Sequence, residues 1–312
     1  MTPVHRAASF RPRPVTVLAV GGTGESFDGD TRTEVTGMLA AVTDELDDRF
    51  RCRWVPYPAS YGPSPRLAGD DYQTSVAVGV RALRAAMATA RAADPAGALM
   101  LIGYSQGAVV IRTLLADASA ASEEALLDSV AAVGFVADPH QPPGVVAGCD
   151  GWGVAGPGPA LPSSIPACWV GTPGDVICNA SPDSLIRDLA DLSAVFSVRG
   201  LGRWAGEVYT RVRAAELQNA ALTAISPRQW RTDLGRLAVA AREVRGYLPS
   251  RLSVPGLRWS NPLGGRHVSY DSEPYRRAPL TDPDGTGCEA LAHWLQVHAT
   301  LGLSARPQRC AA

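Results

Sequence analysis

Apolar residues in this chain fall into short runs that are separated by longer segments of mixed polarity. One run, residues 15–20, ends at Gly21-Gly22-Thr23-Gly24, and another, residues 98–105, ends at a serine between two glycines. Short apolar runs that end at glycine are typical of strands buried in a parallel sheet. Three further runs predict strands at residues 52–57, 130–137 and 165–170.

Segments with helical spacing of their apolar residues alternate with these runs. The spacing predicts helices over residues 31–50, 71–92, 109–116 and 287–301, with a short acidic helix from Ser122. Strands that alternate with helices of this length predict a parallel sheet with helices on both faces. Ligands of such sheets bind at the carboxyl ends of the strands.

The alternation breaks between residues 181 and 256. This stretch has no convincing strand, and its apolar spacing predicts helices at 185–196, 204–225 and 227–247. We therefore expect an α/β core formed by residues 15–180 and 257–305, with a helical insertion at 181–256. Residues 1–14 are expected to form an N-terminal tail.

Ser105 lies in the sequence Gly103-Tyr104-Ser105-Gln106-Gly107, between a predicted strand and a predicted helix. A Gly-x-Ser-x-Gly motif needs this context, because the turn is so tight that only small residues fit beside the serine. The turn exposes the hydroxyl at the strand end. Ser105 is therefore the candidate nucleophile.

A serine hydroxyl needs a base within hydrogen-bond reach, and five histidines are available. His5 lies in the predicted tail, and His293 and His298 lie in the last predicted helix. His267 lies in a loop just before that helix, where the base of a doubly wound hydrolase usually lies. His140 follows a predicted strand end and is the alternative.

The base needs an acid that fixes its tautomer. Asp175 follows a predicted strand on a glycine-rich turn and lies between Ser105 and His267, which gives the chain order serine, aspartate, histidine. Asp138, at the preceding strand end, is the competing candidate. An aspartate in either place can also be a turn residue or a helix cap.

Acyl transfer also needs two backbone N–H donors for the oxyanion. The turn after the nucleophile supplies one at Gln106, and we expect Thr23, in the glycine-rich loop after the first strand, to supply the other. That loop is a poor nucleotide site, because it lacks both the Gly-x-Gly-x-x-Gly spacing and the Gly-Lys-Ser/Thr of a P-loop.

Composition narrows the class of protein. The chain has 312 residues, 46% of them hydrophobic, which is enough for one large core. Its net charge of -1 gives no reason to expect a nucleic-acid or anionic-membrane partner. The cysteines lack metal-binding spacing, so we expect no metal and no cofactor. Cys168 and Cys178 bracket a loop and could pair in an oxidising compartment, but reduced thiols are the simpler expectation.

No apolar stretch typical of a signal peptide or a membrane-spanning helix is visible in the sequence. We therefore expect synthesis as a soluble cytoplasmic chain without stable membrane insertion.

Three motifs resemble those of the cutinase-like serine esterases, which have an α/β-hydrolase fold. They are Gly-Tyr-Ser-Gln-Gly-Ala at 103–108, Gly-Gly-Thr-Gly-Glu at 21–25 and Gly-Asp-Val-Ile-Cys at 174–178. The resemblance implies a catalytic triad of Ser105, Asp175 and His267, with Thr23 and Gln106 as oxyanion donors. It covers residues 15–178 and 258–302.

One departure from compact cutinases is the long separation of Asp175 from His267, which the helical insertion fills. This arrangement is similar to the lysin B esterases of mycobacteriophages. The similarity implies a lysis enzyme that hydrolyses the ester between mycolic acids and arabinogalactan in the envelope of mycolate-containing actinobacteria. It would act after its release from the host cytoplasm at lysis.

Other functions fit the same residues. A host cutinase-like esterase would act on other lipid or carboxylic esters, and an acyltransferase would use the same triad with a sugar in place of water. A third alternative is a hydrolase fold without catalytic activity that binds the cell wall. Such a protein would need none of the triad candidates, so the presence of all of them argues against it.

Overall fold

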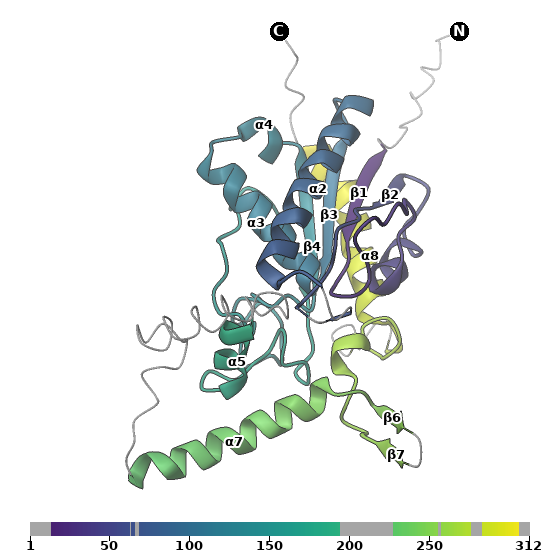
Figure 1. The fold of residues 1–312 in the computed structure, drawn as a ribbon. Coiled ribbons are helices and arrows are strands. Elements are labelled where there is room, and N and C mark those ends of the chain that lie inside the picture. Colours follow the sequence, from purple (N-terminus) through teal and green to yellow (C-terminus); the bar gives the residue numbers. More distant parts are fainter. Residues whose placement is uncertain are drawn as a thin grey trace, which may run out of the picture.

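The computed structural model of the chain describes residues 14–62, 64–65, 69–193, 227–254, 257–275 and 283–305. Five parallel strands form one sheet in the order β2-β1-β3-β4-β5 (Figure 1). This confirms the parallel sheet expected from the sequence. The strands are β1 (Val15–Val20), β2 (Phe50–Trp54), β3 (Ala98–Tyr104), β4 (Val130–Val136) and β5 (Ala167–Val170).

Helices cover both faces of this sheet (Figure 1). Alternate residues of a strand point to opposite faces, and β1 shows the consequence. Val17 packs in the cluster that includes residues of α8, whereas Leu18 packs in the cluster formed with α2 and α3. The helices of the core are α1 (Ala40–Thr43), α2 (Tyr72–Ala93), α3 (Gln106–Ala120), α4 (Glu124–Leu127) and α8 (Gly287–Ala305).

The helix expected over residues 31–50 is largely wrong. The structure has only the 3-10 turn η1 (Gly37–Leu39) followed by α1. Gly37 has a φ of +67°, which breaks helical continuity, and a Cβ there would lie 2.2 Å from the Glu25 carboxylate. Met38 and Val42 are nevertheless buried, so the spacing identified the buried side chains of this segment but not its backbone.

The segment expected to be helical at 181–256 contains two described helices, α5 (Leu185–Ser193) and α7 (Pro227–Tyr247), which pack against each other. The expected helix at 204–225 lies outside the described residues. The expectation of no strand is wrong, because β6 (Arg251–Val254) pairs with β7 (Leu257–Ser260) as an antiparallel hairpin. In Figure 1, α7 is the long helix beyond the sheet, and the hairpin follows it.

Two buried arginines fix α5 and α7 to their surroundings. The Arg187 guanidinium donates to the carbonyl oxygens of Gly153 and Ala180, and stacks on Trp152 at 4.2 Å. Arg236, on α7, donates to the carbonyl of Asp183 just before α5. A buried cation is stable only when such acceptors surround it, so these contacts hold the added helices in one position.

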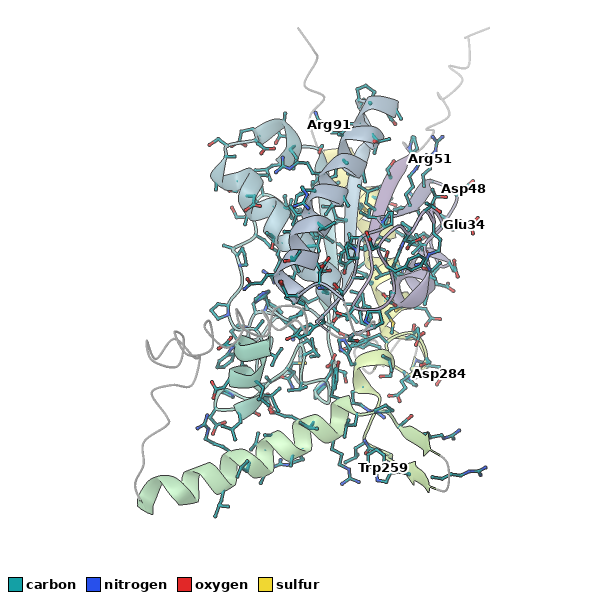
Figure 2. The ribbon with its side chains drawn as sticks, viewed as in Figure 1. Glu34, Asp48, Arg51, Arg91, Trp259 and Asp284 are labelled. Atoms are coloured by element: carbon teal, nitrogen blue, oxygen red, sulfur yellow. The ribbon has the colours of Figure 1, made fainter. Side chains whose placement is uncertain are left out.

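Other charged side chains lie on the outside of the core, as Figure 2 shows for Glu34, Asp48 and Arg51. Trp259 projects from the hairpin with 39% of its surface exposed. Within the described ranges, no helix is long and apolar enough to cross a membrane.

Candidate active site

Ser105 occupies the turn between β3 and α3 with a φ of +51° and a ψ of −115°. Residues other than glycine rarely adopt these backbone angles, so the backbone of Ser105 is strained. The glycines beside it are sterically required, because a Cβ at Gly107 would lie 1.9 Å from the carbonyl oxygen of Val20 and one at Gly103 would lie 2.7 Å from the amide of Ala108. The turn holds the Ser105 hydroxyl at the carboxyl edge of the sheet.

His267 lies beside this hydroxyl. It belongs to the 3-10 turn η4 (Arg266–Val268), and its Nε2 is 3.1 Å from Ser105 Oγ. Its Nδ1 is 2.9 Å from Asp175 Oδ2. Because a carboxylate can only accept, Nδ1 carries the proton and Nε2 is free to accept the proton of Ser105.

Asp175 has no exposed surface. Burial by itself raises the pKa of its carboxyl, but His267, the Tyr270 hydroxyl and the Ile177 backbone N–H together outweigh burial and hold that pKa below its usual range. The carboxylate is therefore ionised at neutral pH. It orients the imidazole and stabilises the imidazolium that forms when the base takes a proton.

Two backbone amides are available near the serine. Gln106 is the first residue of α3, and its N–H has no acceptor within the helix. In the glycine-rich loop, the N–H of Gly22 donates to Glu25 and that of Gly24 donates to Ala59, whereas no partner is described for the N–H of Thr23. These are the two donors expected for the oxyanion.

Side-chain contacts hold this pair of residues together. The Thr23 hydroxyl donates to Gln106 Oε1 at 3.3 Å, and Gln106 Nε2 donates to the carbonyl of Ser60 at 3.0 Å. The Tyr57 hydroxyl donates to the carbonyl of Gly21 at 2.7 Å and lies 3.3 Å from Gln106 Oε1. The loop after β1 and the first turn of α3 are therefore fixed relative to each other before any ligand binds.

The structure does not bring the alternative candidates to Ser105. Asp138 accepts two hydrogen bonds from Arg112 and one from the Trp169 indole, and the Nδ1 of His140 is bonded to the carbonyl of Gly156. On α8, His293 is exposed and His298 stacks on Trp294. His5 lies outside the described residues.

The described cysteines are free thiols, so Cys168 and Cys178 do not pair. Among the residues that the structure describes, no cluster of histidine, cysteine or carboxylate side chains could hold a metal ion.

Ser105 and His267 open into a cavity of about 530 Å³. The helices α5 and α7 form part of its wall through Leu189, Val244 and Tyr247. Val176 and Ile177, which follow Asp175 in the chain, also line it. These side chains are largely apolar, so the cavity suits an apolar group next to the reacting carbonyl.

Sequence reasoning missed several residues that hold the site. Tyr104 stacks on the His267 ring at 5.2 Å and donates to the carbonyl of the same residue, and Tyr247 lies against that ring as well. Glu25 accepts the amides of Gly22 and Met38. Only Tyr270 carried a signal that could have been used, which is its position three residues after the histidine.

The family model described as Cutinase matches residues 14–186, which is more than half of the chain. No curated protein matches the sequence.

Several solved structures are similar to this chain at low sequence identity. Lysin B from mycobacteriophage D29 is 15% identical with a TM-score of 0.49, covering 91% of this chain and 99% of that one. The catalytic core of acetyl xylan esterase from Trichoderma reesei is 20% identical with a TM-score of 0.42, covering 64% and 99%. A cutinase-like protein from Cryptococcus sp. is 17% identical with a TM-score of 0.41, covering 53% and 79%.

Proposed function

Because this chain belongs to the cutinase family and is a carboxylic ester hydrolase, we propose that it cleaves lipid esters with Ser105 as nucleophile, His267 as base and Asp175 as acid. The observation that carries the proposal is the continuous hydrogen-bonded line from Ser105 Oγ through the imidazole to Asp175 Oδ2. This is the arrangement that acyl transfer through serine requires.

The reaction has two halves. Ser105 attacks the ester carbonyl while His267 Nε2 takes its proton, and the N–H groups of Thr23 and Gln106 bind the oxyanion. The imidazolium then protonates the leaving alcohol, and the acyl group stays on the serine. A water molecule, activated by the same imidazole, releases the acid and restores the enzyme.

The acyl group is proposed to lie in the cavity, against the wall that α5 and α7 form. Leu189, Val244 and Val268 line the cavity and yet have 58%, 38% and 60% of their surface exposed. Apolar side chains that are exposed along a cavity gain stability when a hydrocarbon chain covers them. An acyl chain longer than a few carbons is therefore the expected substrate.

The specific substrate that we propose is the ester of mycolic acid with arabinogalactan, cleaved at the cell envelope when a phage lyses its host. The support is the sequence resemblance together with an insertion between Asp175 and His267 whose helices line the catalytic cavity. A host esterase that acts on other lipid esters, or an acyltransferase, would use the same triad.

Hydrolysis by the wild type and by Ser105→Ala tests the proposal. The substrates are p-nitrophenyl butyrate, p-nitrophenyl laurate, tributyrin and purified mycolyl-arabinogalactan. We expect release of mycolic acid, with all activities lowered at least ~10³-fold by the substitution. Cleavage of only the small esters would overturn the mycolyl substrate, and ester formation with added trehalose or glycerol would favour the acyltransferase.

A further inference from the structure

Tyr270 places its hydroxyl against the acid of the triad. Its Oη is 2.8 Å from Asp175 Oδ2, the same oxygen that accepts from His267 Nδ1 at 2.9 Å. Only 3% of the tyrosine is exposed. This buried carboxylate oxygen therefore accepts short hydrogen bonds from both the base and Tyr270, and Cys178 Sγ lies 3.8 Å from it.

The local backbone explains why the two donors converge. His267 lies in the 3-10 turn η4 (Arg266–Val268) and Tyr270 follows two residues after that turn ends, so both donors come from one short segment. The backbone of Tyr270 is also fixed, because its carbonyl accepts the N–H of Cys288 in α8 at 3.0 Å. The position of the hydroxyl is therefore set by the core and not by solvent.

The direction of each hydrogen bond follows from chemistry. Burial, with the nearby charge of Asp175, raises the pKa of Tyr270 well above its usual value, so the hydroxyl keeps its proton and donates it to the carboxylate. Tyr270 has no second proton to offer. In the contact of 3.4 Å between this hydroxyl and Cys178 Sγ, the thiol is therefore the donor. The other acceptors of the thiol lie farther away, at 3.6 Å for the carbonyl of Asp175, 3.8 Å for Asp175 Oδ2 and 3.9 Å for the carbonyl of Thr172. Burial also raises the pKa of this thiol, which stays neutral.

We propose that Tyr270 is a positioning residue of this esterase: it fixes the Asp175 carboxylate and limits the negative charge that Asp175 presents to His267, with Cys178 as a second donor behind it. The inference rests on the proposed function of the triad. Without the tyrosine hydroxyl, Oδ2 would lose one of its two short hydrogen bonds, and the Ile177 N–H on Oδ1 and the more distant Cys178 thiol would hold the carboxylate less firmly. The imidazole would then hold its proton more strongly and be less well aligned with Ser105.

Tyr270→Phe removes the hydroxyl and keeps the ring. We expect kcat/KM to fall about tenfold with little change in KM, because a hydrogen bond to a charged group is lost at the acid and not in the substrate cavity. The acid limb of the pH profile of kcat/KM should move to higher pH by about half a unit, since the imidazolium is favoured. Tyr275→Phe makes the same chemical change in the same segment, is not one of the donors to Asp175, and is the control that should leave both quantities unchanged.

The other groups that face the imidazole remain as they are in this variant, so they cannot produce the shift. They are Asp175, Glu25, Tyr104 and Tyr247.

Cys178 gives a second, milder test in case Tyr270→Phe does not fold. Cys178→Ala removes the outer donor and should move the acid limb in the same direction by a smaller amount. Cys178→Ser keeps a donor at this position and should restore the wild-type profile. The same pH profile in the wild type, Cys178→Ala and Cys178→Ser would remove Cys178 from the proposal.

A proton NMR measurement separates this inference from the proposed function. The downfield resonance of the His267 Nδ1 proton should shift in Tyr270→Phe and not in Tyr275→Phe, whether or not any ester is cleaved. Absence of Ser105-dependent turnover in the wild type would defeat the proposed function alone. An unchanged resonance and pH profile, or a loss of activity that only follows the loss of folded protein, would overturn the role of Tyr270.

Discussion

The ring of Tyr247, the last residue of α7, lies 5.5 Å from the ring of His267 at an interplanar angle of 40°. Tyr104 stacks at 5.2 Å on the same imidazole. Nearby, the N–H of Gly265 donates to the carbonyl of Leu248, just beyond α7. The end of the inserted helix therefore supports the loop that carries the base.

Loss of the Tyr247 ring should impair the base. Aromatic contacts of this kind contribute about 0.5–1.5 kcal/mol, so Tyr247→Ala should lower kcat on p-nitrophenyl butyrate by up to about tenfold. Tyr247→Phe keeps the ring and should retain wild-type kcat. Steady-state kinetics of the two variants check this, and equal losses in both would contradict a role for the ring.

The two buried aspartates of the sheet edge should respond differently to the same substitution. Asp175→Asn should lower kcat on the order of 10⁴-fold, because the imidazole loses its orienting carboxylate. Asp138→Asn should instead lower the free energy of unfolding by about 3–5 kcal/mol, since it leaves the buried Arg112 without its partner. Kinetics on the folded protein and urea unfolding separate the two effects.

Similar kcat values in the two variants would contradict the assignment of the acid. They would return Asp138 to consideration, because it lies at the end of the strand before Asp175.

Much of this site could be predicted from the sequence because its residues occupy strand ends. The motif around Ser105 demands small neighbours for steric reasons, and Asp175 and His267 follow predicted elements in a fixed chain order. The structure brings His267 within hydrogen-bond distance of both Ser105 and Asp175.

The supporting residues could not be predicted in the same way. Tyr247 reaches His267, and Tyr270 reaches Asp175, from segments that are distant along the chain, and local spacing does not encode such contacts. Only the position of Tyr270 three residues after His267 offered a local signal. The hairpin β6–β7 was missed because each strand has only four residues, and the helix at 31–50 was overestimated because Gly37 interrupts it.

The apolar wall of the cavity should set the preference for acyl length. Replacing both Leu189 and Val244 by serine should lower the ratio of kcat/KM for laurate to that for butyrate about tenfold, since each exposed side chain covers part of a long chain. Leu237→Ser, on α7 with 54% of its surface exposed and not among the residues that line the cavity, is the matched control. An equal loss on both esters would argue against acyl binding here.

Asp30 should make the free energy of unfolding depend on pH at acidic pH. Hydrogen bonds from Arg32, with others from Ser26 and Trp54, hold the pKa of its buried carboxyl well below the usual 3.8. Since the folded-state pKa is lowered, this stabilisation is present above the unfolded-state value and is lost as the pH falls below it.

The difference in unfolding free energy between the wild type and Asp30→Asn should therefore be largest near neutral pH and should narrow below about pH 4. Urea unfolding at a series of pH values measures it. Glu34→Gln, at an exposed carboxylate, is the control. A difference that stays constant across this range would contradict the linkage.

The positive φ of Ser105 has a thermodynamic consequence for the whole molecule. A glycine tolerates this backbone conformation, so Ser105→Gly should unfold at a higher temperature than the wild type, with a gain of about 1 kcal/mol. The most stable version of this protein is then one that cannot form an acyl-enzyme. A chain selected for stability alone would lose this serine. Retention of Ser105 at a strained position is therefore what we expect of selection for catalysis.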